Sequence, residues 1–288
     1  MWTETTRRQY RREDLRYASD MTDAEWALIE PYLPAAKRLG RPRGVALRAV
    51  VEALLYLLRT ASPWRLLPHD FTNRSTVQRY FSVQRYFYAW QAAGLWKTIN
   101  FLLLQQAREQ AGREASPSAG VIDSQSVKTT ESGGPRGFDA GKKIKGRKRH
   151  IITDTAGHLV AARVHAANIQ DRDGAPHLLA SIRYLFPWLR HVFADGGYAG
   201  DKLTTALARH GQWQIEIVKR SDRSTGFSVL PRRWVVERTF AWLNRNRRLA
   251  KDFEATVGSG EAWMYLASVQ LLARRLARSA TNSVAEMA

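Results

Sequence analysis

Three acidic residues lie where their carboxylates could do chemistry in a chain dominated by basic side chains. Asp123 and Asp195 each close a short apolar run with the character of a buried strand. We expect both carboxylates at the carboxyl ends of strands, which is the edge at which α/β sheets bind ligands. The pair Gly196–Gly197 follows directly and allows the chain to turn away sharply, leaving room for a bulky substrate.

The third acid, Glu237, lies in a segment with helical periodicity. Val236, Phe240 and Leu243 recur at i, i+4 and i+7 and form the apolar stripe of this helix. Glu237 lies on a neighbouring face and is the one acid of an arginine-rich helix. A simpler role is open to it, because pairing with Arg233 or another arginine on the same helix would stabilise the helix by up to ~0.5 kcal/mol.

Carboxylates in this arrangement are typical of sites for hard divalent ions, because Mg²⁺ prefers oxygen ligands. Two such ions ~3.5–4 Å apart can activate a water or hydroxyl and stabilise the leaving oxygen in phosphoryl transfer. A strand-end Asp can instead form a turn or cap a helix. Three acids in the order strand, strand, helix favour the metal site. The seven histidines include no H-E-x-x-H or H-x-H pair, so zinc is not indicated.

The charge balance indicates a polyanionic partner. Among 288 residues, 45 are Lys or Arg and 26 are Asp or Glu, which gives a net charge of +19. Such an excess of positive charge favours nucleic acid first and an anionic membrane second. The apolar runs are far shorter than the ~18 residues of a membrane-spanning helix. The chain has no cysteine, which excludes disulfides and thiolate metal sites. We therefore expect a cytoplasmic, nucleoid-associated protein.

Two basic segments are predicted to bind the DNA backbone. Residues 136–150 contain seven basic residues, one acid and interspersed glycines, which predicts a flexible loop that follows phosphates. A second patch surrounds Glu237. The predicted contacts are Lys142, Lys143, Lys145, Arg147, Lys148, Arg149, Arg233, Arg238, Arg245, Arg247 and Arg248.

The amino-terminal part of the chain predicts helices at 21–33, 45–59, 75–91 and 95–110. The start of the third helix resembles a helix-turn-helix recognition surface, whose first residues reach base edges, although polar residues there can also simply cap the helix. The residues predicted to read bases are Asn73, Arg74, Thr76, Gln78 and Arg79. A tandem repeat at 77–82 and 83–87 is interpreted as a local duplication that lengthens this helix.

The rest of the chain predicts alternating strands and helices. Strands are expected at 120–124, 150–154, 159–165, 189–194 and 213–218, and helices at 171–185, 201–210, 234–249 and 261–276. A hairpin before the first of these helices excludes a purely parallel sheet and predicts a mixed α/β sheet flanked by helices. We predict a tail at 1–20, a helical DNA-binding domain at 21–114, an α/β domain at 115–278 and a tail at 279–288.

Several ordered motifs together resemble the DDE transposases of bacterial insertion sequences, most closely the insertion-sequence-five family. The motifs are residues 64–68, 120–128, 142–150, 194–198, 234–242 and 247–249. The resemblance implies an RNase-H-like catalytic domain in which Asp123, Asp195 and Glu237 are catalytic and hold Mg²⁺. Two ions per site are expected, and Mn²⁺ can substitute. Leu230 and Asn244 depart from the family pattern, which usually has Tyr and Lys or Arg at these positions.

The implied activity is DNA transposition. The protein would bind the terminal inverted repeats of its element, cleave the DNA at the ends and join the 3′-OH to target DNA by transesterification. Its partners would be double-stranded DNA and a second copy of itself, in a homodimer or higher assembly, with no membrane and no small-molecule substrate. Two alternatives stay open: an RNase-H-like nuclease without strand transfer, and a catalytically inactive DNA-binding repressor.

Overall fold

A computed structural model of the chain describes residue 4 and residues 11–12, 14–35, 43–71, 76–218 and 231–286. The first helices are α2 (Asp23–Ala27), α3 (Leu47–Thr60), α4 (Thr76–Ala92) and α5 (Leu95–Gln110). The strands are β1 (Ala119–Lys128), β2 (Gly137–Asp139), β3 (Ile144–Asp154), β4 (Leu159–Ala166), β5 (His191–Ala194) and β6 (Gln214–Ile217). The remaining helices are α6 (Asp171–Ala180), α7 (Asp201–Ala208), α8 (Pro231–Leu243) and α9 (Val257–Glu286). Short 3-10 turns include η1 (Glu30–Tyr32), η2 (Trp64–Leu66), η3 (His69–Phe71), η4 (Gly196–Tyr198) and η5 (Arg247–Leu249).

The first helix is shorter than its apolar periodicity predicts. Thr22 and Glu25 form a reciprocal capping box at its start. Pro31 has no backbone N–H to donate to the preceding turn, so α2 ends early and the chain continues as the 3-10 turn η1.

The tandem repeat lies within α4, and its two copies point in different directions. Phe81 of the first copy is exposed, whereas the equivalent Phe87 is fully buried. Six residues advance a helix by one turn and a further ~240°, which accounts for the difference. The duplication lengthens the helix without repeating its contacts.

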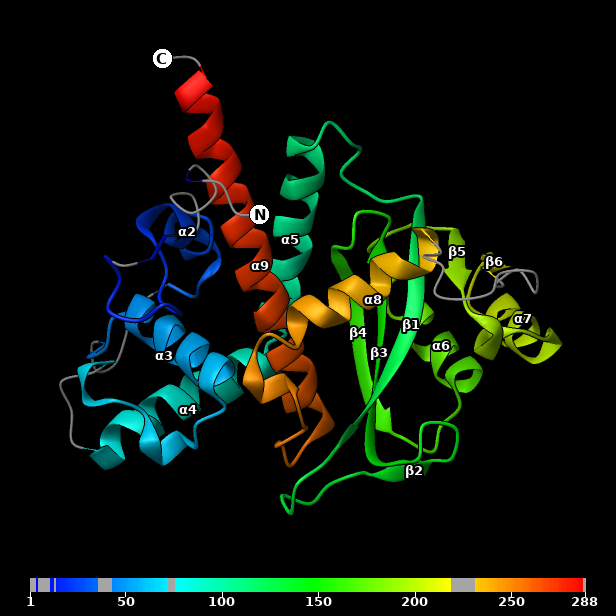
Figure 1. The fold of residues 1–288 in the computed structure, drawn as a ribbon, viewed down its shortest axis with the longest axis horizontal. Helices are drawn as coiled ribbons and strands as arrows, with labels where there is room; N and C mark the ends of the chain where they lie inside the picture. The colour runs from blue at the N-terminus through cyan, green and yellow to red at the C-terminus, as the bar shows by residue number, and fades with distance from the viewer. Residues whose placement is uncertain are drawn as a thin grey trace.

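Helix α9 joins the two ends of the chain in one core. It packs along α5 and also contacts α2, α3, α4 and β4 (Figure 1). Trp263 on α9 stacks on Phe87 with 4.4 Å between ring centroids. Near the amino terminus, Ser19 and Asp20 are buried and Arg12 forms an ion pair with Glu25. The proposed domain boundaries at 20, 114 and 278 stay predictions.

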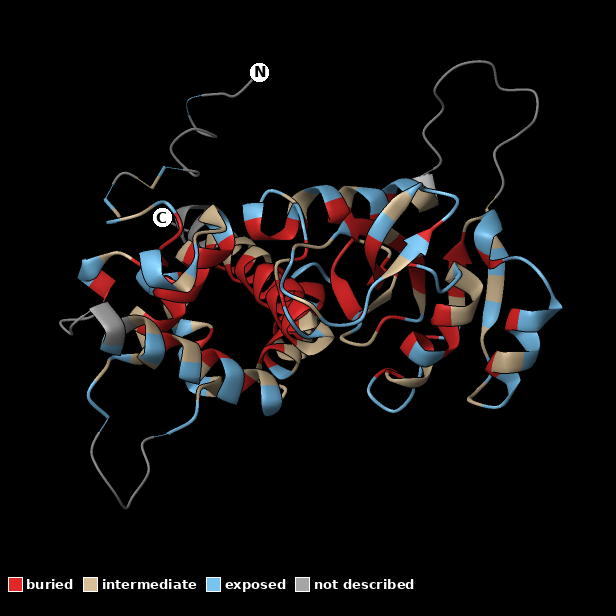
Figure 2. Ribbon diagram, turned by 90° about the horizontal axis from the view of Figure 1, so that it is seen from below, coloured by how far each residue is buried: buried red, intermediate tan, exposed pale blue. Residues whose placement is uncertain are grey.

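The sheet is mixed, which confirms the predicted fold class. β1 pairs antiparallel with β3 and parallel with β5, β5 pairs parallel with β6, and β3 also pairs antiparallel with β2 and β4. Helices α6 and α7 lie on one side of the sheet, and α8 crosses the other (Figure 1). Buried residues run through the middle of both the helices and the sheet, while exposed residues cover the outer surfaces (Figure 2).

The long strand β3 replaces the flexible loop expected at residues 136–150. β2 and β3 form an antiparallel pair in which Gly137 faces Gly146. The prediction of a flexible loop is wrong because most of this basic run is paired strand, with a turn only at residues 140–143. Among the described helices, none is both long enough and apolar enough to cross a membrane.

Candidate active site

The register of two parallel strands places Asp123 beside Asp195. β1 and β5 form their last parallel pair at Val121 and Phe193. Asp123 and Asp195 each lie two residues further along, so they share a face, and neighbouring strands are ~4.8 Å apart. Asp123 does not close its strand as predicted, because β1 continues to Lys128 along β3. The parallel pairing of β1 with β5 nevertheless ends just before Asp123, and this register brings Asp123 and Asp195 together.

Each of these aspartates also accepts a local backbone hydrogen bond. Asp123 Oδ1 accepts one from the backbone N–H of Ser124 at 2.7 Å. Asp195 Oδ1 accepts one from the backbone N–H of Gly197 at 2.8 Å and caps η4. Asp195 therefore has the turn-forming role considered above, and these bonds fix the orientation of both carboxylates.

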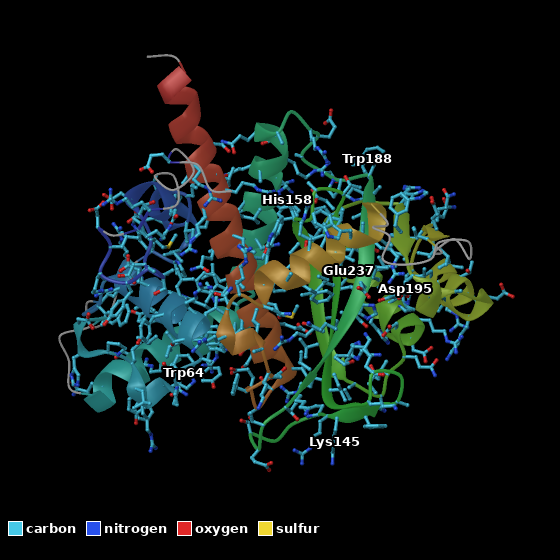
Figure 3. The ribbon with its side chains drawn as sticks, in the orientation of Figure 1. Trp64, Lys145, His158, Trp188, Asp195 and Glu237 are labelled. Atoms are coloured by element: carbon cyan, nitrogen blue, oxygen red, sulfur yellow. The ribbon has the colours of Figure 1, made fainter. Side chains whose placement is uncertain are left out.

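Arg233 connects Glu237 to this pair. Its Nη2 lies 3.6 Å from Oε1 of Glu237 and 3.9 Å from Oδ2 of Asp195. Val236 and Phe240 are buried on the inner side of α8, while Glu237 is about half exposed. Figure 3 shows the labelled Glu237 and Asp195 next to one another, on α8 and beyond the end of β5. One guanidinium thus bridges an acid of the helix and an acid of the sheet.

A fourth carboxylate, which sequence reasoning missed, belongs to the same cluster. Asp171 is the first residue of α6, and its Oδ1 accepts hydrogen bonds from Ser124 Oγ at 2.8 Å and Lys148 Nζ at 2.7 Å. A Cβ added to Gly197 would lie within 4 Å of both Asp171 and Asp195. The only signal in the sequence was an acid at the start of a predicted helix, which is common for helix stability alone.

The environment of Asp123 disfavours its ionised form, whereas the pKa of Asp171 is lowered because its hydrogen bonds from Lys148 and Ser124 outweigh burial. The pKa of Asp123 is raised to about 6, chiefly by burial and then by the nearby Asp195 and Asp171. The hydrogen bond from Ser124 and the positive charge of Lys142 act in the opposite direction without overcoming them.

The donors fit a hard divalent cation in their chemistry, since they are carboxylate oxygens whose mutual repulsion a cation would relieve. Within the described residues, however, no three His, Asp or Glu side chains already stand close enough to hold a metal ion. Arg233 provides the positive charge that lies against Asp195 and Glu237.

A buried hydrogen-bonded chain anchors the turn that carries Asp195. His165 Nδ1 donates to the carbonyl of Ala166, so its Nε2 is free to accept from His150 Nδ1 at 3.5 Å. His150 Nε2 then accepts from the hydroxyl of Tyr198 at 2.7 Å. Because each bond fixes the next tautomer, Tyr198 is held rigidly three residues after Asp195.

Three of the predicted DNA contacts are structural instead. Arg147, Lys148 and Arg149 lie on β3 and are buried, so they cannot follow a phosphate backbone. Arg147 pairs with Asp252 at 2.9 Å, and Arg149 donates to the backbone carbonyls of Leu249, in η5, and Lys251, just after it. The prediction for these three is wrong because both faces of β3 are covered. Successive side chains point to opposite faces of the strand, and all three are therefore buried.

The remaining predicted DNA contacts of this region lie at the turn before β3 and at the start of that strand. Lys142 donates from Nζ to the carbonyl of Ser124 at 2.8 Å, beside the acidic cluster. Lys143 and Lys145 are exposed, and Figure 3 shows Lys145 at the lower rim of the sheet.

The second basic patch, around Glu237, also contains both buried and exposed residues. Arg248 is buried against Glu254, 2.7 Å away, so it too is structural and not the predicted phosphate contact. Arg238 is half-buried, donates to the carbonyl of Ala156 and lies over two tryptophan rings. Arg245 and Arg247 are exposed.

Asn244, which departs from the family pattern, donates to Gln125 Oε1 at 3.2 Å. It therefore ties the end of α8 to β1.

The predicted base-reading residues fall mostly outside the described parts of the chain. Asn73 and Arg74 lie outside the described residues, and the side chains of Thr76 and Arg79 are likewise outside. Gln78 is exposed on α4.

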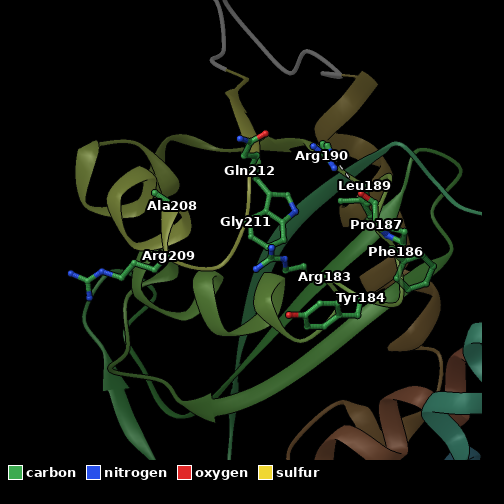
Figure 4. A pocket seen from close by; sticks show the side chains of 11 residues that line it. Arg183, Tyr184, Phe186, Pro187, Leu189, Arg190, Ala208, Arg209, Gly211 and Gln212 are labelled. Carbon is green, nitrogen blue, oxygen red and sulfur yellow. Dashed lines mark hydrogen bonds between the residues drawn. The ribbon is translucent and has the colours of Figure 1, made fainter.

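A cavity of about 630 Å³ lies apart from the acids, between the segment after α6 and the segment joining α7 to β6 (Figure 4). Arginine and aromatic side chains line it, among them Arg183, Tyr184 and Trp213. None of the four carboxylates borders it, so it does not belong to the acidic cluster.

Comparison with known proteins gives concordant matches. Residues 114–272 match the family model "Transposase DDE domain", and residues 21–100 match "Putative transposase of IS4/5 family". A Burkholderia cepacia protein described as "Putative transposase for insertion sequence element IS402" is 34% identical over 116 residues, or 38% of this chain and 54% of that protein. An "Insertion element IS402 uncharacterized 16.2 kDa protein" of the same organism is 35% identical over 115 residues, covering 38% of this chain and 74% of its own length. The chain therefore spans about half the length of the first of these relatives.

Proposed function

The chain belongs to the transposase DDE domain family, and from that premise we propose that it moves its own insertion sequence as a DNA transposase. It binds the terminal inverted repeats of the element, cleaves the DNA at the element ends and joins the freed 3′-OH to target DNA. The predicted resemblance to insertion-sequence transposases is confirmed by the family matches and the relatives.

One observation carries the catalytic part of this proposal. The parallel register of β1 and β5 sets Asp123 beside Asp195, and Arg233 draws Glu237 to the same place. These acids are separated by 72 and 42 residues in the sequence, so a chance meeting at one sheet edge is a poor explanation.

Asp123, Asp195 and Glu237 are the residues that would hold a divalent cation. Mg²⁺ or Mn²⁺ bound there would activate the attacking water or 3′-OH and offset the charge that develops on the phosphate. The protein's own part is to fix the acids. Backbone N–H groups orient the carboxylates of Asp123 and Asp195, and buried Tyr198 anchors the turn after β5.

The DNA would approach over α8. Arg233 is one-third exposed and lies against two carboxylates. We expect its guanidinium to exchange them for a phosphate of the scissile strand, because guanidinium binds phosphate in a two-pronged geometry. Exposed Lys143, Lys145, Arg245 and Arg247 would contact the backbone on either side. The start of α4 would read bases in the terminal repeats.

Two element ends must be processed together, so we expect the active form to be a homodimer or larger assembly on DNA. This expectation follows from the reaction, in which both ends join one target.

The test is a cleavage and joining assay. A supercoiled plasmid carrying the DNA that flanks this gene on both sides is incubated with the protein and Mg²⁺, and the nicked and joined products are resolved. Wild-type protein should produce breaks at the element ends and joined products. Asp195→Asn should reduce both by at least 10³-fold while DNA binding persists, whereas Asp201→Asn on the exposed start of α7 should react like wild type.

Pre-cut ends distinguish the rival activities. Cutting of intact ends without joining of pre-cut ends would identify a nuclease. Binding of the repeats without any cutting, unaffected by Asp195→Asn, would identify a repressor.

A further inference from the structure

The cavity between the segment after α6 and the segment joining α7 to β6 combines aromatic rings with arginines. A second hollow, of about 460 Å³, adjoins it and shares Arg190, Gln212 and Trp213 with it. We call the two together the aromatic groove. Both hollows lie where β5 and β6 begin, whereas Asp195 follows the end of β5. Five residues of extended strand separate Arg190 from Asp195, or roughly 16 Å, and Figure 3 shows Trp188 well apart from Asp195.

Two rings of this groove are exposed to an unusual degree. Tyr184 is 86% exposed and Trp188 is 69% exposed, the largest values among the large apolar side chains that the structure describes. Leu185, next to Tyr184, is exposed as well, and Trp213, which lines both hollows, is half-buried. Apolar side chains that are exposed together, rather than singly, indicate a surface that binds a partner.

Arg183 brings positive charge to two of the rings. Its guanidinium lies 5.5 Å from the ring centroid of Tyr184, and Figure 4 shows the two side by side in the wall of the cavity. Gly211 allows Arg183 to approach Trp213 as well, because a Cβ added at Gly211 would lie 3.0 Å from the ring of Trp213 and 3.5 Å from Nε of Arg183. A ring beside a guanidinium can stack a base on its face while the cation holds the adjoining phosphate.

The second hollow repeats this combination. The exposed Arg190 donates from Nε to the carbonyl of Pro187 at 3.3 Å, which holds it close to the backbone next to Trp188. No Asp or Glu is among the described residues that line either hollow. Glu216, on β6 nearby, is engaged with His191 at 2.8 Å. Electrostatic complementarity therefore favours an anionic occupant.

The combination of rings and arginines favours a single nucleic-acid strand over other partners. In a duplex the base faces are covered by stacking on one another, so protein rings can stack only on unpaired bases. A second copy of the chain would bring two sets of these arginines together across a two-fold axis, which repulsion between like charges opposes. A membrane surface meets side chains that project outward, whereas this groove is concave.

We propose that the aromatic groove binds single-stranded nucleic acid, with bases stacked on Tyr184 and Trp188 and phosphates held by Arg183 and Arg190. The groove is separate from the acids, so it binds a strand whether or not that strand is cleaved. DNA as the natural ligand rests on the proposed function, in which cleavage at an element end frees a strand that can leave its complement.

The test measures the binding of a fluorescent oligothymidylate by fluorescence anisotropy. A length of about 20 nucleotides exceeds a typical single-strand site, and oligothymidylate forms no duplex with itself. The ring variant is Tyr184→Ala/Trp188→Ala, and the charge variant is Arg183→Gln/Arg190→Gln. All four side chains are exposed, so both variants should keep the wild-type melting temperature.

Each variant has a matched control elsewhere on the surface. Tyr88→Ala removes an exposed ring near the end of α4, and Arg113→Gln/Arg163→Gln removes two exposed charges outside the groove. A duplex of the same length is titrated in parallel with every protein, because it offers the same phosphates without unpaired bases.

We expect the ring variant to lose on the order of tenfold or more in affinity for the single strand, since stacking contributes about that much for each base. Its affinity for the duplex should stay at the wild-type level. The charge variant should lower the salt slope, which is the slope of log affinity against log salt concentration, by about 1.4 on the single strand, roughly 0.7 for each phosphate contact. Both controls should bind the single strand like wild type.

Unchanged single-strand affinity in the ring variant would overturn the proposal. Equal losses for strand and duplex in that variant, or equal losses in the charge variant and its control, would overturn it as well, because the groove would then have no preference for unpaired bases or no role beyond net charge. A ring variant that binds the strand like wild type but loses binding to phosphatidylserine vesicles would assign the groove to a membrane. One that instead changes oligomeric mass in light scattering would assign it to a second copy of the chain.

Failure of this inference and failure of the proposed function are distinguishable. If wild type cleaves element ends and the ring variant binds the single strand equally well, only this inference fails. If wild type neither cleaves nor joins element ends but loses single-strand affinity in the ring variant, the proposed function fails and the groove is still a single-strand site.

Discussion

Replacing Asp123 by Asn should make the protein more stable at neutral pH while abolishing its reaction. The side chain keeps its shape, and its amide oxygen can still accept the hydrogen bond from the backbone N–H of Ser124. The substitution removes a negative charge from the cluster that also contains Asp171 and Asp195. Loss of this carboxylate, which we propose to be catalytic, should increase stability because function requires like charges to be held together.

The magnitude follows from the pKa. The pKa of Asp123 rises from 3.8 to about 6 because of burial first and the neighbouring acids second. Each unit corresponds to 1.36 kcal/mol, so the ionised form costs at most about 3 kcal/mol. Asp123 is partly exposed, and solvent screening reduces this to about 1–2 kcal/mol. Since the folded pKa is the higher one, the cost is present above pH 6 and disappears as the pH falls towards 4.

The assay is denaturant unfolding at pH 7.5 and pH 5. At pH 7.5 Asp123→Asn should exceed wild type in free energy of unfolding by about 1–2 kcal/mol, and the difference should shrink at pH 5. Asp201→Asn, a matched exposed change, should leave stability unaltered. Added Mg²⁺ should stabilise wild type more than Asp123→Asn. A variant that is less stable than wild type at both pH values would refute the reasoning, since the carboxylate would then be held by favourable contacts.

Three further outcomes follow from the buried polar groups. Burial lowers the pKa of His150 from 6.5 to about 3. Only the unfolded chain therefore takes up this proton between pH 7 and pH 5, and the free energy of unfolding should fall by about 2 kcal/mol. His150→Gln should remove this part of the pH dependence in denaturant unfolding. Arg147→Met should cost about 3–5 kcal/mol of stability, because it leaves the buried Asp252 unpaired. The exposed Lys145→Gln should leave stability unchanged and lower the salt slope of DNA binding by about 1. The reverse pattern would contradict the burial of β3. Gly174→Ala would place a Cβ 2.7 Å from His150 Nδ1, so it should lower the melting temperature at a cost of about 1–3 kcal/mol, and an unchanged melting temperature would count against the histidine pair.

Local pattern was sufficient for most elements of the fold. Residues 95–110 were predicted as a helix and form α5 with the same bounds, because apolar periodicity there matches the buried face. The capping box at Thr22 is likewise a local feature, since both of its side chains lie within four residues. The hairpin of β3 and β4 was predicted from apolar runs around Gly157, which adopts a φ of +89° in its turn.

The errors share one physical cause, which is pairing between distant residues. Arg147 is buried because Asp252, 105 residues away, lies against it. A basic run of this kind looks solvated until its partner is known. Asp171 joins the acids through Ser124, 47 residues earlier, and nothing near it in the sequence indicates this. Spacing along the chain could predict that the two strand aspartates share an edge, but not which other acid meets them.

Burial therefore decides which cations are available for DNA. Arg147, Lys148, Arg149 and Arg248 were predicted to bind phosphate, yet each is buried and bonded within the protein. Their charges are balanced by acids or carbonyls, so they contribute little to attraction at the surface. Where a chain carries a large positive charge, the density of a basic run in the sequence therefore does not indicate where a polyanion binds, because each cation must also be exposed to contact a phosphate.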